Sequence, residues 1–347
     1  MDKVTTSQKE LGEQPNEITQ SKRAVVNENI SDVEDEEEEE EEVTQNDNVE
    51  EGLLDDYPDD AEEIDAIHSR ISDIPKLGLE RFKQLERLCL RQNLIMDIEG
   101  FEPLSNTLVE LDLYDNKISR IRNLSELTKL KMLDLSFNKI KHIKNLDTLT
   151  NLEDIYFVSN RISKIENLDH LTLVTNLELG ANKIRVIENL DKLILLKQLW
   201  LGKNKITRLE NLNPLSNLRI LSIQSNRLTK LENLEELHNL EEIYLSHNAI
   251  EKLEGLENNI KLTTIDIANN RIKHIENLSH LTNLEEIWAN NNLLETSCFD
   301  ELNKELGGLK ELTTIYLEGN PMQLANRATY RNKVHLALPQ VKQIDAT

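Results

Sequence analysis

One spaced pattern constrains the fold of this chain more than any other feature. Residues 196–206 read L-x-x-L-x-L-x-x-N-x-I, and the same pattern returns along most of the chain. Its asparagine falls at positions 93, 116, 138, 160, 182, 204, 226, 248, 270, 292 and 320. The first step is 23 residues, the next eight are 22 residues each, and the last is 28 residues. Eight identical steps indicate one structural unit that is repeated in a stack.

The spacing within each repeat predicts the conformation of the unit. Leu199 and Leu201 alternate with Trp200, as inward and outward side chains alternate in a strand. Neighbouring repeats would pair these strands in a parallel sheet. We expect the asparagine side chain to bond backbone groups that the turning chain leaves unpaired. Apolar residues at spacing three, such as Leu212 and Leu215, favour a helical or 3₁₀ return path.

Together these features predict an α/β fold, a leucine-rich-repeat solenoid of about twelve repeats of 22 residues with a parallel sheet on its concave face. The solenoid is predicted over residues 64–320. It would begin with a degenerate first repeat, in which Ser69 replaces the asparagine. The longer last step predicts a helix over residues 296–306, and residues 321–347 are predicted to cap the open apolar end.

The acidity of the chain is concentrated before the repeats. Residues 1–63 contain 24 Asp or Glu and four Lys or Arg, a net charge of −20 out of −24 for the whole chain. Residues 34–42 are all acidic. Such a segment predicts a disordered acidic tail, with weak electrostatic contact to a basic partner as the alternative. The near-neutral remainder offers no basic stripe, so no nucleic-acid partner is expected.

Cysteine usage and hydropathy bear on the compartment. Cys89 and Cys298 lie about nine repeats apart and could not pair in a rigid solenoid, and no cysteine-rich caps are present. No apolar run is long enough to span a membrane, and the first residues lack the apolar core of a signal peptide. We expect a nuclear and cytoplasmic protein without a membrane partner, monomeric by itself.

No motif of an active site occurs in the sequence. Phosphate-binding glycine loops, His-Glu-x-x-His, Cys-x-x-Cys and the Gly-x-Ser-x-Gly elbow are all absent. His142 and His274 occupy the same repeat position, which indicates a surface position rather than metal ligation. The sequence therefore predicts no enzyme, no catalytic residue, no metal and no cofactor.

The positions between the two inward leucines are the candidate binding surface, because alternation points them toward the concave side. In order they are Cys89, Asp112, Asp134, Tyr156, Glu178, Trp200, Ser222, Tyr244, Asp266, Trp288 and Tyr316. Both tryptophans and three of the six tyrosines of the chain stand in this column. Aromatic residues form strands well, which explains one or two of them. An exposed aromatic line with interleaved carboxylates instead favours an interface with a folded partner of basic or mixed surface.

Several stretches together resemble one protein family, the leucine-rich-repeat regulatory subunits of protein phosphatase 1. They are residues 88–95, 111–116, 221–231, 244–248 and 338–347. The resemblance covers about residues 64–347. It implies a non-catalytic partner of the phosphatase catalytic subunit that controls its assembly, activity or nuclear role in mitosis and chromosome segregation. It also implies nuclear and cytoplasmic localisation and allows for a third regulatory protein in the complex.

The resemblance further implies phosphatase contacts on the concave face. With Tyr244 added from the aromatic column, the predicted partner-binding residues are Asp134, Tyr156, Glu178, Trp200, Tyr244, Asp266, Glu286, Trp288 and Tyr316. Tyr156 and Trp200 stand where close relatives carry Phe. The short phosphatase-docking motif of a basic residue, Val, any residue and Phe is absent, which agrees with docking through the arc.

Three other functions remain as alternatives. The first is an acidic-tailed leucine-rich-repeat chaperone or scaffold for another basic protein, which would lose its partner when residues 1–63 are deleted. The second is a ribonucleoprotein scaffold, which the near-neutral solenoid disfavours. The third is an enzyme, for which no set of catalytic residues converges.

Overall fold

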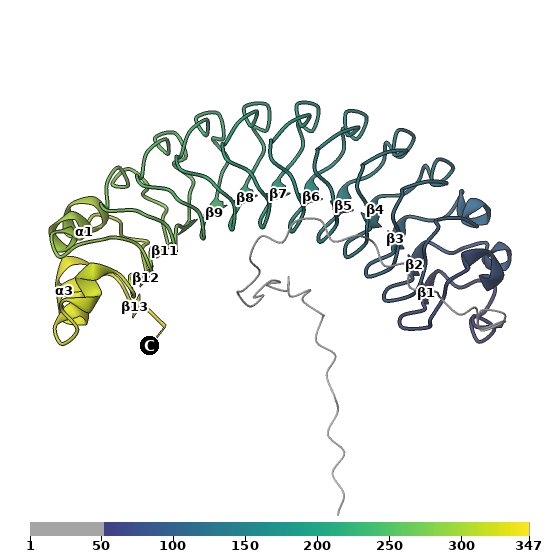
Figure 1. Cartoon of the computed structure of the whole chain (residues 1–347), viewed down its shortest axis with the longest axis horizontal. Coiled ribbons are helices and arrows are strands. Elements are labelled where there is room, and N and C mark those ends of the chain that lie inside the picture. The colour runs from purple at the N-terminus through teal and green to yellow at the C-terminus, as the bar shows by residue number, and fades with distance from the viewer. Residues whose placement is uncertain (1–51, 347) are drawn as a thin grey trace, which may run out of the picture. The chain divides into compact units, whose positions relative to one another are not determined.

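Short strands, one per repeat, build a single parallel sheet. The computed structural model describes residues 52–346, which lie within one compact unit. Thirteen strands of the described residues pair in chain order. They are β1 (Glu63–Asp65), β2 (Arg87–Cys89), β3 (Glu110–Asp112), β4 (Met132–Asp134), β5 (Asp154–Tyr156), β6 (Asn176–Glu178), β7 (Gln198–Trp200), β8 (Ile220–Ser222), β9 (Glu242–Tyr244), β10 (Thr264–Asp266), β11 (Glu286–Trp288), β12 (Thr314–Tyr316) and β13 (Gln343–Ile344). The solenoid curves with its strands on the inner side (Figure 1), which confirms the predicted fold class.

Strand register stacks equivalent positions of successive repeats. Leu177 of β6 pairs with Leu199 of β7, which pairs with Leu221 of β8. All three side chains are fully buried. Because every repeat presents the same inward positions, the apolar side chains form one continuous core along the described solenoid.

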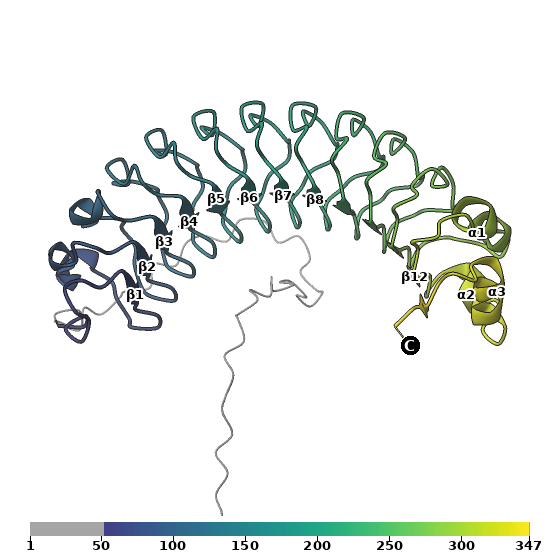
Figure 2. The same ribbon diagram turned by 180° about the vertical axis from the view of Figure 1, so that it is seen from behind.

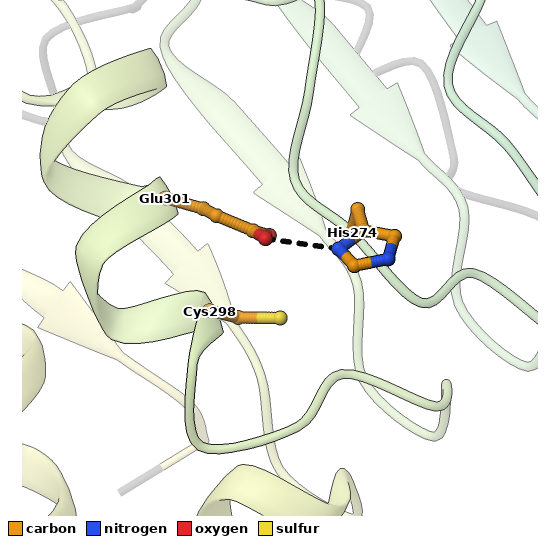
Figure 3. Close-up of side chains that lie close together, drawn as sticks. All are labelled: His274, Cys298 and Glu301. Carbon is orange, nitrogen blue, oxygen red and sulfur yellow. Dashed lines mark hydrogen bonds and ion pairs between the residues drawn. The ribbon is translucent and has the colours of Figure 1, made fainter.

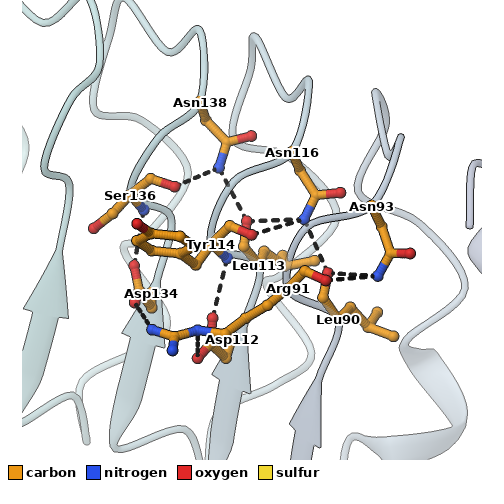
Figure 4. Close-up of polar contacts among 10 residues, drawn as sticks. All are labelled: Leu90, Arg91, Asn93, Asp112, Leu113, Tyr114, Asn116, Asp134, Ser136 and Asn138. Carbon is orange, nitrogen blue, oxygen red and sulfur yellow. Dashed lines mark hydrogen bonds and ion pairs between the residues drawn. The ribbon is translucent and has the colours of Figure 1, made fainter. Parts of the chain in front are cut away.

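The repeat asparagine bonds backbone groups of two neighbouring repeats, as the sequence predicts (Figure 4). The Nδ2 of Asn138 donates to the carbonyl of Leu113 at 3.0 Å and to that of Leu135 at 3.2 Å. Its Oδ1 accepts the backbone N–H of Ile118 at 2.9 Å. One side chain thus satisfies donors and acceptors that the turning backbone would otherwise leave buried and unpaired.

The predicted helical or 3₁₀ return path occurs in the central repeats as single turns of 3₁₀ type and not as helices. There the apolar positions at spacing three lie on consecutive turns. The backbone N–H of Leu215 donates to the carbonyl of Leu212, and the N–H of Leu218 donates to the carbonyl of Leu215, both at 2.9 Å. These bonds have the i to i+3 spacing of a 3₁₀ helix, but each closes one turn. Helices of the described chain occur only toward its two ends. They are η1 (Ile74–Leu77), η2 (Leu79–Arg81), η3 (Glu102–Leu104), α1 (Cys298–Leu306), α2 (Pro321–Leu324) and α3 (Tyr330–Ala337).

A second column of asparagines holds the returns together. Asn189 has φ +58° and donates from Nδ2 to the carbonyl of Ile165 in the preceding repeat at 2.6 Å. Asn233 has φ +60° and bonds Leu209 in the same way at 2.7 Å. Asparagine tolerates the left-handed conformation better than most residues. This explains why the sequence Glu-Asn-Leu returns in so many repeats.

Residues before the first strand, β1, pack on the start of the solenoid. Most of the predicted disordered acidic tail, residues 1–63, lies outside the described residues. Its last part packs on the first repeat: Leu54 is buried, and the Tyr57 hydroxyl donates to the carbonyl of Asp65 at 2.9 Å. The Arg81 guanidinium also bonds the carbonyl of Leu54. The acidic composition concealed these few apolar contacts, so the predicted tail boundary at residue 63 is too late.

Three helices and a last strand close the C-terminal end (Figure 2). The predicted long helix of the last repeat is confirmed as α1, which contacts α3 of the cap. Beyond the pattern, β13 pairs with β12 and extends the sheet. The Oδ1 of Asp345 accepts the backbone N–H groups of Leu317 and Glu318 at 2.7 and 3.0 Å. Between residues 52 and 346, no helix combines the length and hydrophobicity needed to cross a membrane.

Candidate functional site

Four aromatic side chains at the ends of concave strands form a line of neighbouring rings. Trp200 and Tyr244 stack with their ring centroids 6.3 Å apart. Tyr244 meets Trp288 edge to face at 6.4 Å, and Trp288 meets Tyr316 in the same way at 5.9 Å. All four side chains are half-buried. We call Trp200, Tyr244, Trp288 and Tyr316 the aromatic ladder.

Small residues beneath the rings make the ladder possible. Trp200 and Tyr244 belong to β7 and β9, and the strand between them contributes Ser222, which is 1% exposed. Asp266, 6% exposed, occupies the same place between Tyr244 and Trp288. A large side chain at either position would separate the rings, so the alternation of large and small residues lets rings two repeats apart touch.

Each ladder ring is held by a hydrogen bond at its polar atom. The Tyr244 hydroxyl donates to Glu242 Oε2 at 2.5 Å. The two indole Nε1 atoms also donate two residues back, from Trp200 to Gln198 Oε1 at 3.3 Å and from Trp288 to Glu286 Oε2 at 3.2 Å. The Tyr316 hydroxyl accepts from Gln343 Nε2 at 2.7 Å. The rings are therefore oriented before any partner arrives.

Sequence reasoning missed Gln198 and Glu242 as residues of this surface. The signal that could have found them is their position two residues before an aromatic residue in a strand. Residues i and i+2 of a strand lie on the same face. Every ladder strand that offers Gln or Glu at that position uses it to hold its ring.

Two tyrosines of the concave column have raised pKa values. Burial raises the pKa of Tyr156 to about 12, and the nearby charge of Asp154 adds to the shift. Burial likewise raises the pKa of Tyr244, together with the hydrogen bond to Glu242. In both cases the surroundings disfavour the charged phenolate.

The predicted carboxylates divide into two groups. Asp134 and Asp266 are 8% and 6% exposed, and each Oδ1 accepts the backbone N–H two residues on, from Ser136 at 2.8 Å and from Ala268 at 3.0 Å. Both carboxylates therefore stabilise the turn that leaves their strand. Glu178 and Glu286 are half-buried.

The nine predicted binding residues lie on one face of the sheet. Tyr156 of β5 pairs in register with Glu178 of β6, which pairs with Trp200. Within the column, Tyr156 and Glu178 lie between the buried Asp134 and the aromatic ladder. The structure thus brings the whole set together in one column, with Glu286 beside it in the same strand as Trp288. Partner binding by this column stays a prediction.

A charged cluster that the sequence analysis did not single out lies over β3 and β4 (Figure 4). Arg91 Nε is 2.6 Å from Asp112 Oδ2, and Arg91 Nη2 is 3.3 Å from Asp134 Oδ2. The guanidinium carbon lies 4.6 Å from the centroid of the Tyr114 ring. Asp112 Oδ1 accepts the backbone N–H of Tyr114 at 3.0 Å. Arg91 and Tyr114 directly follow the second inward leucine of their repeats, two positions beyond the column residues Cys89 and Asp112.

One histidine, one cysteine and one glutamate also lie close together (Figure 3). Their ligand atoms fall within 4.8 Å of one another, and His274 Nδ1 is 2.9 Å from Glu301 Oε1. A similar contact occurs at the equivalent histidine, between His142 and Glu166 at 3.0 Å, so it is one of the side-chain contacts that link repeats. Burial and the Glu301 carboxylate raise the pKa of the Cys298 thiol to about 12. Cys298 Sγ donates to the carbonyl of Lys273.

Comparison with known proteins gives one family match and several relatives. The leucine-rich repeat family matches residues 127–239 and 219–347. Over 81 residues the chain is 55% identical to protein phosphatase 1 regulatory subunit SDS22 of Schizosaccharomyces pombe, and over 80 residues it is 53% identical to SDS22 of Saccharomyces cerevisiae. These matches cover 23% and 22% of this chain and 24% of each relative. Over 43 residues the chain is 58% identical to human protein phosphatase 1 regulatory subunit 7, covering 12% of this chain and 11% of that protein. The chain thus spans about a quarter or less of the length of these relatives.

Solved structures of other repeat proteins share the fold. An internalin (inlF) of Listeria monocytogenes superposes with a TM-score of 0.62 at 25% identity, over 82% of this chain and 87% of the internalin. A leucine-rich-repeat protein of Leptospira interrogans superposes with a TM-score of 0.62 at 22% identity, over 76% of this chain and 73% of that protein. The second likeness shows the fold alone.

Proposed function

This chain belongs to the leucine-rich repeat family, and we propose that it is a non-catalytic regulatory subunit that binds the catalytic subunit of protein phosphatase 1. Its relatives in two yeasts bear the name of regulatory subunits of that phosphatase. The aromatic ladder carries the proposal, because four half-buried rings in contact along one concave face are more than the fold requires. The partner would dock on the ladder and on the column that leads to it.

The arrangement of the rings supports tight binding. Tyr and Trp dominate the binding energy of many interfaces because they bury a large area with few rotatable bonds. Hydrogen bonds already fix the orientation of Trp200, Tyr244 and Trp288. A partner therefore has less side-chain entropy to remove on binding. The half-buried Glu178 and Glu286 would add orientation and selectivity for a basic surface.

The regulatory effect would follow from differential binding. A subunit that prefers one state of the catalytic subunit shifts its population toward that state. We propose that this controls the assembly, activity or nuclear role of the phosphatase in mitosis, in the nucleus and the cytoplasm. A third regulatory protein in the same complex is part of this proposal.

The test is calorimetric binding of the full chain to the phosphatase catalytic subunit. The double variant Trp200→Ala, Trp288→Ala is expected to lose about 2 kcal/mol of binding free energy for each ring. Circular dichroism would verify that the variant keeps its fold. Leu336→Ala is the matched control, because it truncates an apolar side chain that is 85% exposed on α3, far along the chain from Trp200.

The outcomes separate the alternatives. Wild-type binding that the double variant loses supports the proposal. Equal binding by both proteins would reject the ladder as the docking site. A variant lacking residues 1–51 should bind as the full chain does. Loss of binding in that variant would instead favour the acidic-tailed chaperone. Residues 52–63 are kept in it because Leu54 packs in the core.

A further inference from the structure

Phe137 occupies a position that folding alone does not favour. Its φ is +56°, and its side chain is 43% exposed. The left-handed conformation is costly for a bulky side chain, and an exposed ring gains little from burial. At this position, just before the repeat asparagine, the other left-handed residues are smaller or polar. They are Gln92, Asp115, Ser159, Ala181, Lys203, Ser225, His247, Asn269 and Asn291.

Phe137 is the outermost member of a stack drawn from three successive repeats. Its ring centroid lies 4.8 Å from that of Tyr114, at an interplanar angle of 45°. The Arg91 guanidinium lies over the Tyr114 ring. Two aromatic rings therefore stand together on this part of the surface, with the Phe137 ring open to solvent.

Negative charges outnumber positive charges among the groups beneath these rings. Asp112 and Asp134 both pair with the single guanidinium of Arg91, so these contacts leave one surplus negative charge. Burial raises the pKa of Asp112, and the charge of Asp134 raises it further, while the turn N–H of Tyr114 and the Arg91 guanidinium lower it. An additional cation would therefore be attracted to this point.

The cluster is continuous with the proposed binding column. Asp134 pairs in register with Tyr156, and the backbone N–H of Phe137 bonds the carbonyl of Val158 in the same neighbouring repeat at 2.7 Å. A partner seated on the aromatic ladder and Tyr156 would thus meet this cluster next. We call Arg91, Asp112, Tyr114, Asp134 and Phe137 the N-terminal patch.

We propose that the N-terminal patch is a second docking site for the same partner and receives a lysine or arginine of a basic segment on it. Aromatic faces attract ammonium and guanidinium groups, and the surplus carboxylate charge would add to this attraction. The inference rests on the proposed function, since it assigns a second contact to the same phosphatase catalytic subunit. It also explains why a phenylalanine is kept at a strained and exposed position.

The deciding variant is Phe137→Asn in the full chain. Asparagine tolerates the left-handed conformation and removes an exposed apolar ring, so the melting temperature should stay the same or rise. Binding to the phosphatase catalytic subunit, measured by calorimetry, should weaken by about tenfold or more. Ala181→Asn is the matched control, because Ala181 has φ +54° at the same repeat position. It should bind as the wild type does.

A second variant tests the basic character of the contact. Asp112→Asn keeps an oxygen for the Tyr114 N–H and removes the surplus charge. The affinity of this variant should fall less steeply than that of the wild type when the salt concentration is raised. An unchanged salt dependence would reject a lysine or arginine as the occupant.

The outcomes distinguish this inference from the proposed function. If the tryptophan double variant loses binding while Phe137→Asn binds like the wild type, only the N-terminal patch is rejected. If Phe137→Asn lowers the melting temperature and leaves affinity unchanged, Phe137 is a folding residue and the inference is wrong. If the wild type does not bind the catalytic subunit, both proposals fail.

Discussion

The indole Nε1 of Trp288 donates a 3.2 Å hydrogen bond to Oε2 of Glu286, two residues earlier in the same strand. Tyr244 and Glu242 repeat this relationship in β9. Because alternate residues of a strand share a face, the strand itself brings each ring to its acceptor. The acidic residues beside the aromatic ladder therefore position the rings, whatever they contribute to partner binding.

Glu286 offers a test of this positioning that needs no partner. Glu286→Ala should free the Trp288 indole and speed the exchange of its N–H proton with water. Glu286→Gln should retain an acceptor oxygen and leave exchange near the wild-type rate. Nitrogen-15 labelling of tryptophan would show two indole signals, since the chain has two tryptophans. The Trp200 signal is the internal control, and equal exchange in both Glu286 variants would contradict the prediction.

The repeat asparagines should be among the most sensitive polar positions. Asn182 donates to the carbonyls of Phe157 and Leu179 at 2.8 and 3.1 Å, and its Oδ1 accepts from the N–H of Ile162 at 2.9 Å. Asn182→Ala leaves these buried groups unpaired, at about 1–3 kcal/mol for each group that stays unsatisfied. Urea unfolding measures the loss.

Asn217 is the matched control for that substitution. It also donates to a carbonyl of the preceding repeat, that of Ile194 at 2.8 Å, but its contact is exposed to water. Asn217→Ala should cost less than about 1 kcal/mol, because water replaces the lost partner. Similar costs at both sites would mean that burial of the asparagine column is not what makes it stabilising.

Gly255 stands where neighbouring repeats have the second asparagine, and it has φ +72°. A Cβ placed there would lie 3.1 Å from the carbonyl oxygen of Leu231. Gly255→Ala should destabilise the protein by about 1 kcal/mol because of the left-handed backbone. Gly255→Asn should offset this cost, since Asn233 and Asn277 at equivalent positions each bond a carbonyl of the preceding repeat at 2.7 Å.

Thermal unfolding of the two Gly255 variants tests the role of that asparagine column. The asparagine variant is expected to melt above the alanine variant and close to the wild type. An alanine variant that melts at or above the asparagine variant would show that the side-chain hydrogen bond contributes nothing there.

The raised pKa of Tyr156 makes a pH prediction. Its pKa is about 12 in the folded chain, because the ring is buried, against about 10 for an unfolded tyrosine. A raised folded-state pKa means that the proton is held more tightly in the folded state. The associated stability is fully present below pH 10 and is lost as the pH rises toward 12. In Tyr156→Phe, the free energy of unfolding should fall less across this interval. Parallel curves for the two proteins would contradict the raised pKa.

Much of the concave surface could be predicted from the period alone. The position of Trp200 between Leu199 and Leu201 placed it on the inner face, and the 22-residue interval placed Glu178 and Tyr156 beside it. The contact between the rings of Phe137 and Tyr114 could not be predicted from the period. This contact joins two different positions of the repeat pattern, so it depends on how two loops turn.

The sequence by itself determined the solenoid, the inward core and the column to which each concave residue belongs, because a fixed period repeats the same backbone environment. Only the tertiary structure decided which column residues offer a surface. Asp134 and Asp266 follow the pattern as Glu178 does, yet they are buried and bond the turn after their strand. Exposure depends on the size of side chains in adjacent repeats and on short-range turn geometry. For the same reason, Leu54 joined the core although acidic residues surround it in the sequence.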